Sequence, residues 1–156
     1  MIEIKPVDYN NPKQLRVLKS CLSEWFRNPK DLNLTSPRMR YPFNFDQWLK
    51  MYALTTTVSY VLSDADWIVA HISLRFHVDQ RRAHIFHLIV DSRRRGEGHG
   101  KHLIGAMEAI ARERDCEKVT LFVRPGNELA ISLYEALGYM ITADTSNERV
   151  AMEKIL

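Results

Sequence analysis

The chain contains the stretch His84-Ile-Phe-His-Leu-Ile-Val-Asp91, followed by Ser-Arg-Arg-Arg95 and by Gly96-Glu-Gly-His-Gly-Lys101. Its first part is an apolar run rich in branched residues, which predicts a largely buried strand. Residues 102–112 then place apolar side chains at helical spacing, which predicts an amphipathic helix. A strand, a glycine-rich loop and a helix therefore follow one another without interruption.

The loop has three glycines at alternate positions, Gly96, Gly98 and Gly100. Glycine adopts positive φ and lets another molecule approach the backbone closely. A loop of this kind leaves amide N–H groups unpaired at the positive end of the helix dipole, which favours phosphate. The Walker pattern needs four residues before its Gly-Lys-Ser/Thr, and the Rossmann pattern needs its third glycine one residue later, so neither fits.

The remaining pattern, Arg95-x-x-Gly98-x-Gly100 after a strand, resembles the pyrophosphate loop of the Gcn5-related N-acetyltransferase (GNAT) family, Arg/Gln-x-x-Gly-x-Gly/Ala. A second stretch, Asn127-Glu-Leu-Ala-Ile-Ser-Leu-Tyr-Glu-Ala-Leu-Gly-Tyr139, resembles the helix of that family with the form Asn-x-x-Ala-x-x-Leu-Tyr-x-x-x-Gly-Phe. Because both motifs occur in the family's order and at its usual separation, the resemblance is specific.

The resemblance implies an α/β class and a single GNAT domain over residues 1–156. The fold would have a mixed central β-sheet splayed between the fourth and fifth strands, with helices on both faces. Periodicity alone predicts a switch towards strands at Thr55 and a loop over residues 28–43. The predicted helices are 13–27, 45–53, 98–115 and one after Asn127, and the predicted strands are 2–7, 56–62, 67–76, 83–91, 118–124, 139–143 and 149–155.

Composition sets further bounds. The 156 residues suffice for one compact domain, and no apolar run approaches the roughly 18 residues of a membrane-spanning helix. The start Met1–Pro6 lacks the features of a secretory signal, and Cys21 and Cys116 have no metal-ligand spacing, which favours a reducing cytoplasm. The net charge of +3 is mild, but Arg93–Arg95 gather where a polyanionic ligand would bind. We expect no nucleic-acid or membrane partner.

Acetyl-CoA is the cosubstrate that the resemblance implies. The loop amides would bind its pyrophosphate, and the backbone of the preceding strand would pair with the pantetheine arm as an added strand does. The N–H of Leu88 would face the thioester oxygen, and Asn127 would hydrogen-bond the arm from the other side. The cofactor-binding residues implied in this way are Leu88, Ile89, Val90, Arg95, Gly96, Glu97, Gly98, His99, Gly100, Lys101 and Asn127.

The catalytic residues are Tyr134, His84 and His87 by the same resemblance. The Tyr134 hydroxyl, with an ordinary pKa of about 10, suits a proton donor to a departing thiolate. His84 falls where histone acetyltransferases of the family have a glutamate base, and histidine titrates near neutral pH. Strand alternation puts His84 and His87 on opposite faces unless a bulge intervenes. His84, His87 and a water relay without a dedicated base remain alternatives.

Two further patterns bear on function. Ribosomal-protein alanine acetyltransferases of the family carry a glutamate base where this chain has Phe122, which argues against that acceptor. The spacing of His84 with His87, and of His99 with His102, is that of metal ligands, but His99 lies in the phosphate loop and His102 on the helix behind it. We therefore expect no metal site.

The sequence predicts an N-acetyltransferase that transfers acetyl to a primary amine by direct attack in a ternary complex. No cysteine lies in either motif to carry the acyl group. The alternative is a catalytically silent acyl-CoA-binding module that regulates a partner. A polyamine, an amino acid, an antibiotic and a protein N-terminus all remain open as acceptors, and homodimers are common in the family.

Overall fold

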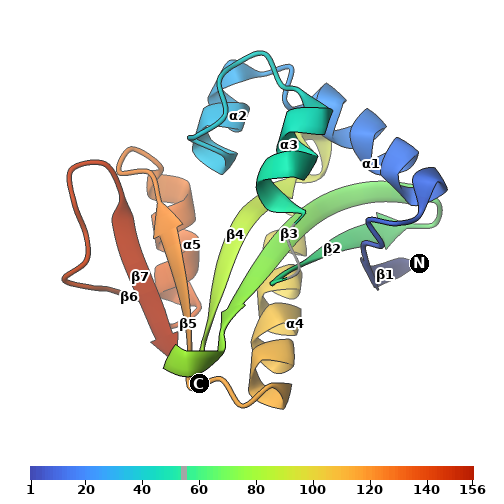
Figure 1. Ribbon diagram of the computed structural model, residues 1–156. Helices are drawn as coiled ribbons and strands as arrows, with labels where there is room; N and C mark the ends of the chain where they lie inside the picture. Colours follow the sequence, from blue (N-terminus) through green and yellow to red (C-terminus); the bar gives the residue numbers. More distant parts are fainter. Residues whose placement is uncertain (54–55) are drawn as a thin grey trace. The chain divides into compact units, whose positions relative to one another are not determined.

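The computed structural model describes residues 1–53 and 56–156 (Figure 1). The predicted switch to strand periodicity at Thr55 lies outside these residues. The helices are α1 (Pro12–Trp25), α2 (Pro29–Thr35), α3 (Phe45–Tyr52), α4 (His99–Glu113) and α5 (Glu128–Ala136), with short 3-10 turns at Val78–Gln80 and Ser92–Arg94. The strands are β1 (Ile2–Pro6), β2 (Thr57–Asp64), β3 (Trp67–His77), β4 (Arg82–Val90), β5 (Lys118–Val123), β6 (Met140–Ile141) and β7 (Val150–Ile155).

The seven strands form one mixed sheet in the order β1-β2-β3-β4-β5-β7-β6, which confirms the predicted fold class. The described residues divide into two compact units. Unit 1 comprises Met1–Ser73 and His87–Gly100, and unit 2 comprises Leu74–Phe86 and Lys101–Leu156. The prediction of a single domain stays a prediction. No described helix is long and apolar enough to cross a membrane.

Unit 1 holds the N-terminal strands and three helices. β1 pairs antiparallel with β2, from Ile2 opposite Asp64 to Pro6 opposite Tyr60. In α1, Asn11 accepts hydrogen bonds at the helix start, and the apolar stripe that follows buries Leu18, Leu22 and Phe26. The helices α1 and α3 lie side by side (Figure 1). Their buried side chains form one apolar core, in which the Trp48 ring packs against those of Phe26, Phe43 and Tyr52.

The predicted loop over residues 28–43 is wrong in its first part, because α2 occupies Pro29–Thr35. Asn28-Pro29 directly follows the helix predicted over residues 13–27, and an Asn-Pro dipeptide there predicts the end of that helix. The same dipeptide also starts a helix, since the Asn28 side chain accepts hydrogen bonds from the amides of Lys30 and Asp31, and proline suits the first helical position. Leu32 then anchors α2 in the core at 1% exposure.

Unit 2 holds the parallel strand pair. The first four residues of β4, Arg82–Ile85, pair in register with Lys118–Leu121 of β5. β7 pairs antiparallel with β5 along its whole length, and β6, shorter than predicted, pairs with β7. Along β5, Val119, Leu121 and Val123 are buried, while the alternate residues are not. One face of these strands is therefore core, and the other carries polar groups.

Candidate active site

The glycine loop of unit 1 has the conformation that the motif predicts. Gly96 and Gly98 have backbone φ angles of +83° and +86°, values that residues other than glycine rarely adopt. A methyl group added at either glycine meets no described atom within 4 Å, so the space beside the loop is open. Gly100 lies one residue inside α4, which begins at His99.

The amides of this loop are available to a ligand. Among the described residues, none accepts a hydrogen bond from the amide of Gly96, Glu97 or Gly98. The first amides of α4 also lack partners within the helix, as at every helix start. These N–H groups, with the positive end of the helix dipole, suit a diphosphate.

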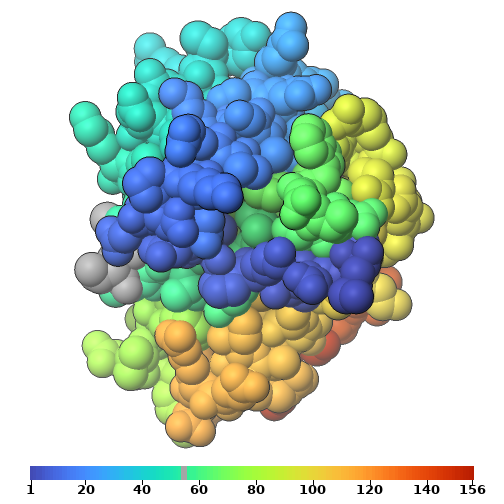
Figure 2. Space-filling model, turned by 90° about the vertical axis from the view of Figure 1, so that its right-hand side faces the viewer, coloured from blue at the N-terminus to red at the C-terminus, as the bar shows by residue number. Residues whose placement is uncertain are grey.

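The arginines before the loop are bonded to carboxylates of unit 1, although we expected them to face a polyanion. Arg93 lies 2.8 Å from Asp91, and this pairing, the largest influence, lowers the pKa of the buried Asp91 carboxyl. Arg94 lies 3.1 Å from both Asp64 and Glu97. On the surface, the loop (yellow) lies beside the turn between β2 and β3 (green), the region that the ion pair of Arg94 with Asp64 joins to it (Figure 2).

Arg95, the first residue of the motif, is also engaged within unit 1. Its Nε donates to the carbonyl of Val90 at 3.1 Å, and its Nη2 lies 3.4 Å from Asp31. This bond uses one of the two lone pairs of the Val90 carbonyl, which belongs to the stretch Leu88–Val90 whose backbone the resemblance pairs with the pantetheine arm. Each arginine before the loop therefore has a carboxylate partner, whereas the amides of Gly96, Glu97 and Gly98 have no acceptor among the described residues.

The strand β4 has a kink at His87, whose φ is +53°. For a residue with a side chain, this left-handed conformation costs about 1–2 kcal/mol. It is held from three sides in unit 1. His71 Nδ1–H donates to the His87 carbonyl at 3.0 Å, the Trp48 ring stacks on the His87 ring at 4.3 Å, and the Tyr52 ring meets it edge-on at 4.0 Å. The kink immediately precedes Leu88, the residue whose amide would face the thioester.

The two histidines nearest the kink are core residues. His87 is 6% exposed and His71 is 0% exposed. Burial lowers the pKa of His71 to about 4, against the weaker opposing effect of its bond to the His87 carbonyl. Its Nε2 has no hydrogen-bond partner among the described residues. His71 is therefore neutral at physiological pH and acts as a hydrogen-bond donor through Nδ1.

His84, the other candidate base, lies on the polar face of unit 2. Its Nδ1 is 2.8 Å from the Thr120 hydroxyl, which also accepts a hydrogen bond from Arg82 at 3.1 Å. The His84 ring lies 4.7 Å from the ring of Phe122. Burial and, after it, the charge of Arg82 lower the pKa of His84 to about 4. His84 is thus neutral at physiological pH and half-buried.

Tyr134 lies on the buried face of α5 in unit 2, at 7% exposure. Burial raises the pKa of its hydroxyl well above the ordinary value. Its hydroxyl makes no hydrogen bond to any described residue, so the proton is not committed within the protein. Its ring lies 5.6 Å from that of Tyr139, whose hydroxyl donates to Glu108 at 2.9 Å. Lys154 donates to the other oxygen of Glu108 at 2.9 Å.

Sequence reasoning missed the residues that support these groups. Glu108 falls between the buried Met107 and Ala111 on the apolar stripe of α4, and a carboxylate in that position is a signal of a buried partner. His71 sits within an unbroken buried run of β3, where a polar residue carries the same signal.

Asn127 caps α5, since its side-chain oxygen accepts from the amide of Ala130 at 3.3 Å. The amide nitrogen of this side chain has no partner among the described residues, so capping leaves a donor for a ligand. Lys101 is exposed. Within the described part of the chain, no three His, Cys, Asp or Glu side chains could hold a metal ion.

Comparison with known proteins agrees with this geometry. Residues 20–139 match the acetyltransferase (GNAT) family. A stretch of 60 residues is 40% identical to N-alpha-acetyltransferase 30 of Xenopus laevis, and it spans 38% of this chain and 22% of that relative.

Solved structures share the fold at low identity. The GNAT domain of PAT from S. lividans superposes with a TM-score of 0.85 at 16% identity, covering 99% of this chain and 90% of that one. Spermidine N-acetyltransferase from Vibrio cholerae, solved with CoA and spermine, has a TM-score of 0.76 at 16% identity and coverages of 99% and 95%. Because the family match alone covers well over half of its residues, the chain belongs to the acetyltransferase (GNAT) family.

Proposed function

We propose that the protein is an acetyl-CoA-dependent N-acetyltransferase that transfers acetyl to a primary amine by direct attack in a ternary complex. The observation that carries the proposal is the glycine loop, with Gly96 and Gly98 at positive φ, open space beside them and unpaired amides before α4. In a member of this family, such a loop fits the diphosphate of coenzyme A. Two free thiols, Cys21 and Cys116, favour a cytoplasmic location, and we take residues 1–156 as one domain.

The glycine loop and the strand before it would bind and orient the cosubstrate. Acetyl-CoA supplies an activated thioester. The amides from Gly96 to Lys101 would hold its diphosphate, and the backbone of Leu88–Val90 would pair with its arm. The residue with positive φ, His87, immediately precedes Leu88, whose amide would be the donor aimed at the thioester oxygen.

Tyr134 and His84 would manage the protons. When the amine nitrogen bonds to the thioester carbon and the carbon–sulfur bond breaks, the leaving thiolate takes a proton, which the Tyr134 hydroxyl is free to give. The raised pKa keeps Tyr134 protonated at every physiological pH. The attacking amine loses a proton, and neutral His84 would accept it. With a pKa of about 4, His84 holds that proton only briefly, so it would act as a relay to solvent.

His87 is a poor base in comparison. Its ring is 6% exposed and packed between Trp48 and Tyr52. A role in shaping β4 accounts for these contacts without proton transfer.

The test combines acetyl-CoA binding by calorimetry with thiol release across a panel of amines. Tyr134→Phe should lower turnover at least about a hundredfold, because general acids contribute that much, and leave acetyl-CoA affinity nearly unchanged. Tyr60→Phe is the control, since Tyr60 is a half-buried tyrosine of β2 outside both motifs. Full activity of Tyr134→Phe would remove it as the acid. Tight binding without thiol release for any amine would favour the silent acyl-CoA-binding module.

A further inference from the structure

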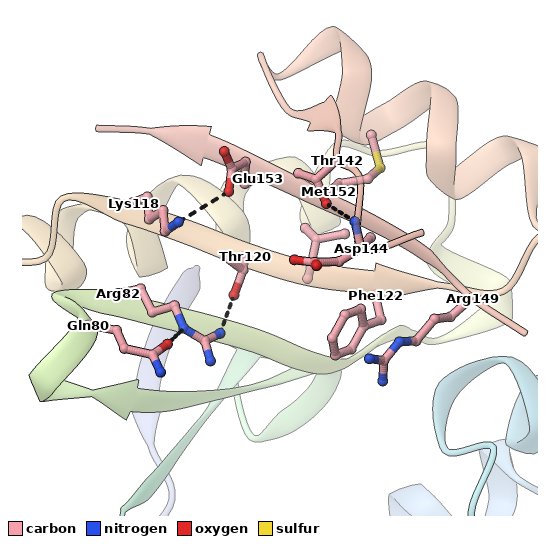
Figure 3. Close-up of a pocket in the computed structure, with 12 residues that line it drawn as sticks. Gln80, Arg82, Lys118, Thr120, Phe122, Thr142, Asp144, Arg149, Met152 and Glu153 are labelled. Atoms are coloured by element: carbon pink, nitrogen blue, oxygen red, sulfur yellow. Dashed lines mark hydrogen bonds and ion pairs between the residues drawn. The ribbon is translucent and has the colours of Figure 1, made fainter. Parts of the chain in front are cut away.

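The polar face of unit 2 contains a cavity of about 520 Å³. Alternation along β5 brings Lys118, Thr120 and Phe122 to this face, because their neighbours point into the core. The strand β7 and residues 142–149 complete the lining (Figure 3). The cavity is large enough for an amino acid or a short peptide.

Cations outnumber carboxylates around this cavity. The cationic side chains are Arg82, Lys118 and Arg149, and the carboxylates are Asp144 and Glu153. Lys118 and Glu153 neutralise each other at 3.4 Å, as Figure 3 shows. The remaining charges are two guanidinium groups and the Asp144 carboxylate, which leaves a net positive cavity.

Arg149 differs from Arg82, the other arginine of the cavity, whose guanidinium donates hydrogen bonds to Gln80 and Thr120. The guanidinium carbon of Arg149 lies 3.7 Å from the centre of the Phe122 ring, and the two side chains lie together at the cavity (Figure 3). Among the described residues, no acceptor forms a hydrogen bond or ion pair with Arg149. Stacking on an aromatic ring occupies a guanidinium face and leaves the N–H groups at its edge free. Such an edge matches a carboxylate, which accepts two parallel hydrogen bonds.

Phe122 joins this arginine to the candidate base. It is 46% exposed, contacts Arg149 on the cavity side and has its ring 4.7 Å from that of His84. Thr120, which bonds His84, also lines the cavity. A molecule whose anionic end binds Arg149 therefore lies beside the group that would relay the amine's proton.

We propose that this cavity binds the carboxylate of the acceptor, so that the substrate is an amine that also carries a carboxylate, as amino acids and acidic peptides do. That the substrate is an amine follows from the proposed acetyltransferase function. That it carries a carboxylate follows from the cavity alone. Polyamines and aminoglycosides are disfavoured, because a second ammonium group would be repelled by Arg82 and Arg149, and the Asp144 carboxylate offsets only one of these two charges.

The test uses three probes with the same amine and chain but different far ends: γ-aminobutyrate, butylamine and putrescine. Binding is followed by the backbone NMR shifts of residues 118–122 and 149–153 with CoA present, and turnover by thiol release. We expect γ-aminobutyrate to exceed butylamine at least tenfold in affinity and in kcat/KM, with putrescine lowest. Higher salt should shrink the preference, because it screens exposed charges.

Arg149→Gln should abolish the preference, bringing the ratio of γ-aminobutyrate to butylamine close to one. Arg149→Lys should restore part of it, since lysine keeps the charge but not the two-pronged geometry. Arg81→Gln is the matched control, because Arg81 is an exposed arginine of unit 2 that pairs with Glu117 at 2.7 Å and does not line the cavity. It should keep the preference intact.

The two proposals fail in different ways. If putrescine binds better than γ-aminobutyrate, or if Arg149→Gln keeps the preference, the carboxylate site is overturned even though acetyl transfer stands. If the probes bind with the expected order but no amine releases thiol, the acetyltransferase proposal fails while the carboxylate site stands.

Discussion

Unit 1 and unit 2 use the same kinds of side chain in opposite ways. In unit 1, Arg94 is bonded to Asp64 and Glu97, whereas in unit 2 Arg149 is stacked on Phe122 and bonded to no described acceptor. The glycine loop of unit 1 offers unpaired backbone amides, whereas the cavity of unit 2 offers the donors of the Arg149 side chain. Anion binding should therefore depend on glycine conformation in unit 1 and on side-chain charge in unit 2.

Aromatic and histidine residues follow the same division. Trp48 is 1% exposed and Phe122 is 46% exposed, although each lies against a histidine of β4. His71 is enclosed in unit 1, while His84 lies on the polar face of unit 2. Substitutions in the aromatic pair, Trp48 and Phe122, and in the histidine pair, His71 and His84, test this difference between the two units.

The aromatic pair should give the largest effect. Trp48→Ala removes a buried ring that contacts Phe26, Tyr52 and His87, and we expect it to destabilise the protein by about 3–5 kcal/mol. Phe122→Ala removes a half-exposed ring and should cost less than about 1 kcal/mol. Urea unfolding monitored by circular dichroism measures both. Similar losses in the two variants would show that Phe122 is as much a core residue as Trp48.

How much of this could be predicted varies with the kind of interaction. The glycine loop, the long helix and the positions of the strands along the chain follow from local signals, namely φ preference, apolar spacing and turn residues, whereas the mixed sheet was predicted from the family resemblance. The helix α2 was missed because Asn28-Pro29 ends one helix and starts the next, and nothing within the dipeptide separates these uses.

The site partners were beyond prediction for a different reason. The pairing of Arg95 with Asp31, and that of Thr120 with His84, join residues far apart in the chain, and only the folded arrangement brings them together. The arginine run predicts a polyanion site as a charge pattern, which stays a prediction, and it does not show that each arginine has a carboxylate partner. Arg149 carries no motif at all, and its availability depends on Phe122 lying beneath it.

The histidine pair should give an effect of intermediate size, visible as pH dependence. Both His71 and His84 have a pKa lowered to about 4 in the folded state from about 6.5 in the unfolded chain. Between these values the unfolded chain binds more protons, so stability is full above pH 6.5 and is lost as the pH falls towards 4. Each histidine should account for about 3 kcal/mol of this loss.

Salt separates the two histidines. Burial lowers the pKa of His71, whereas cations add to burial at His84, namely Arg82, His77, Arg75 and Arg149. Urea unfolding from pH 7 to pH 4.5 should show a shallower pH slope in His84→Gln than in the wild type. The difference in pH slope between the wild type and His84→Gln should shrink at high salt, because salt screens the cations near His84. The pH slope that His84→Gln retains should stay nearly unchanged by salt. An unaltered slope in His84→Gln would place its titration outside this pH range.

The smallest effects on stability should come from replacing glycine by alanine at two positions, where we expect changes in the free energy of unfolding of opposite sign. Gly98 in unit 1 has φ of +86°, so Gly98→Ala is strained and should cost about 1–2 kcal/mol. Gly105 lies exposed inside α4 in unit 2 with open space around it, so Gly105→Ala should stabilise the protein by about 1 kcal/mol. Thermal unfolding measures both changes.

Calorimetry with acetyl-CoA then tests the loop directly. Gly98→Ala should weaken binding, because strain at this position redirects the amides of the glycine loop, while Gly105→Ala should bind as the wild type does. If both variants bind equally well, the loop amides do not hold the diphosphate, and anion binding in unit 1 must rest on its side chains after all.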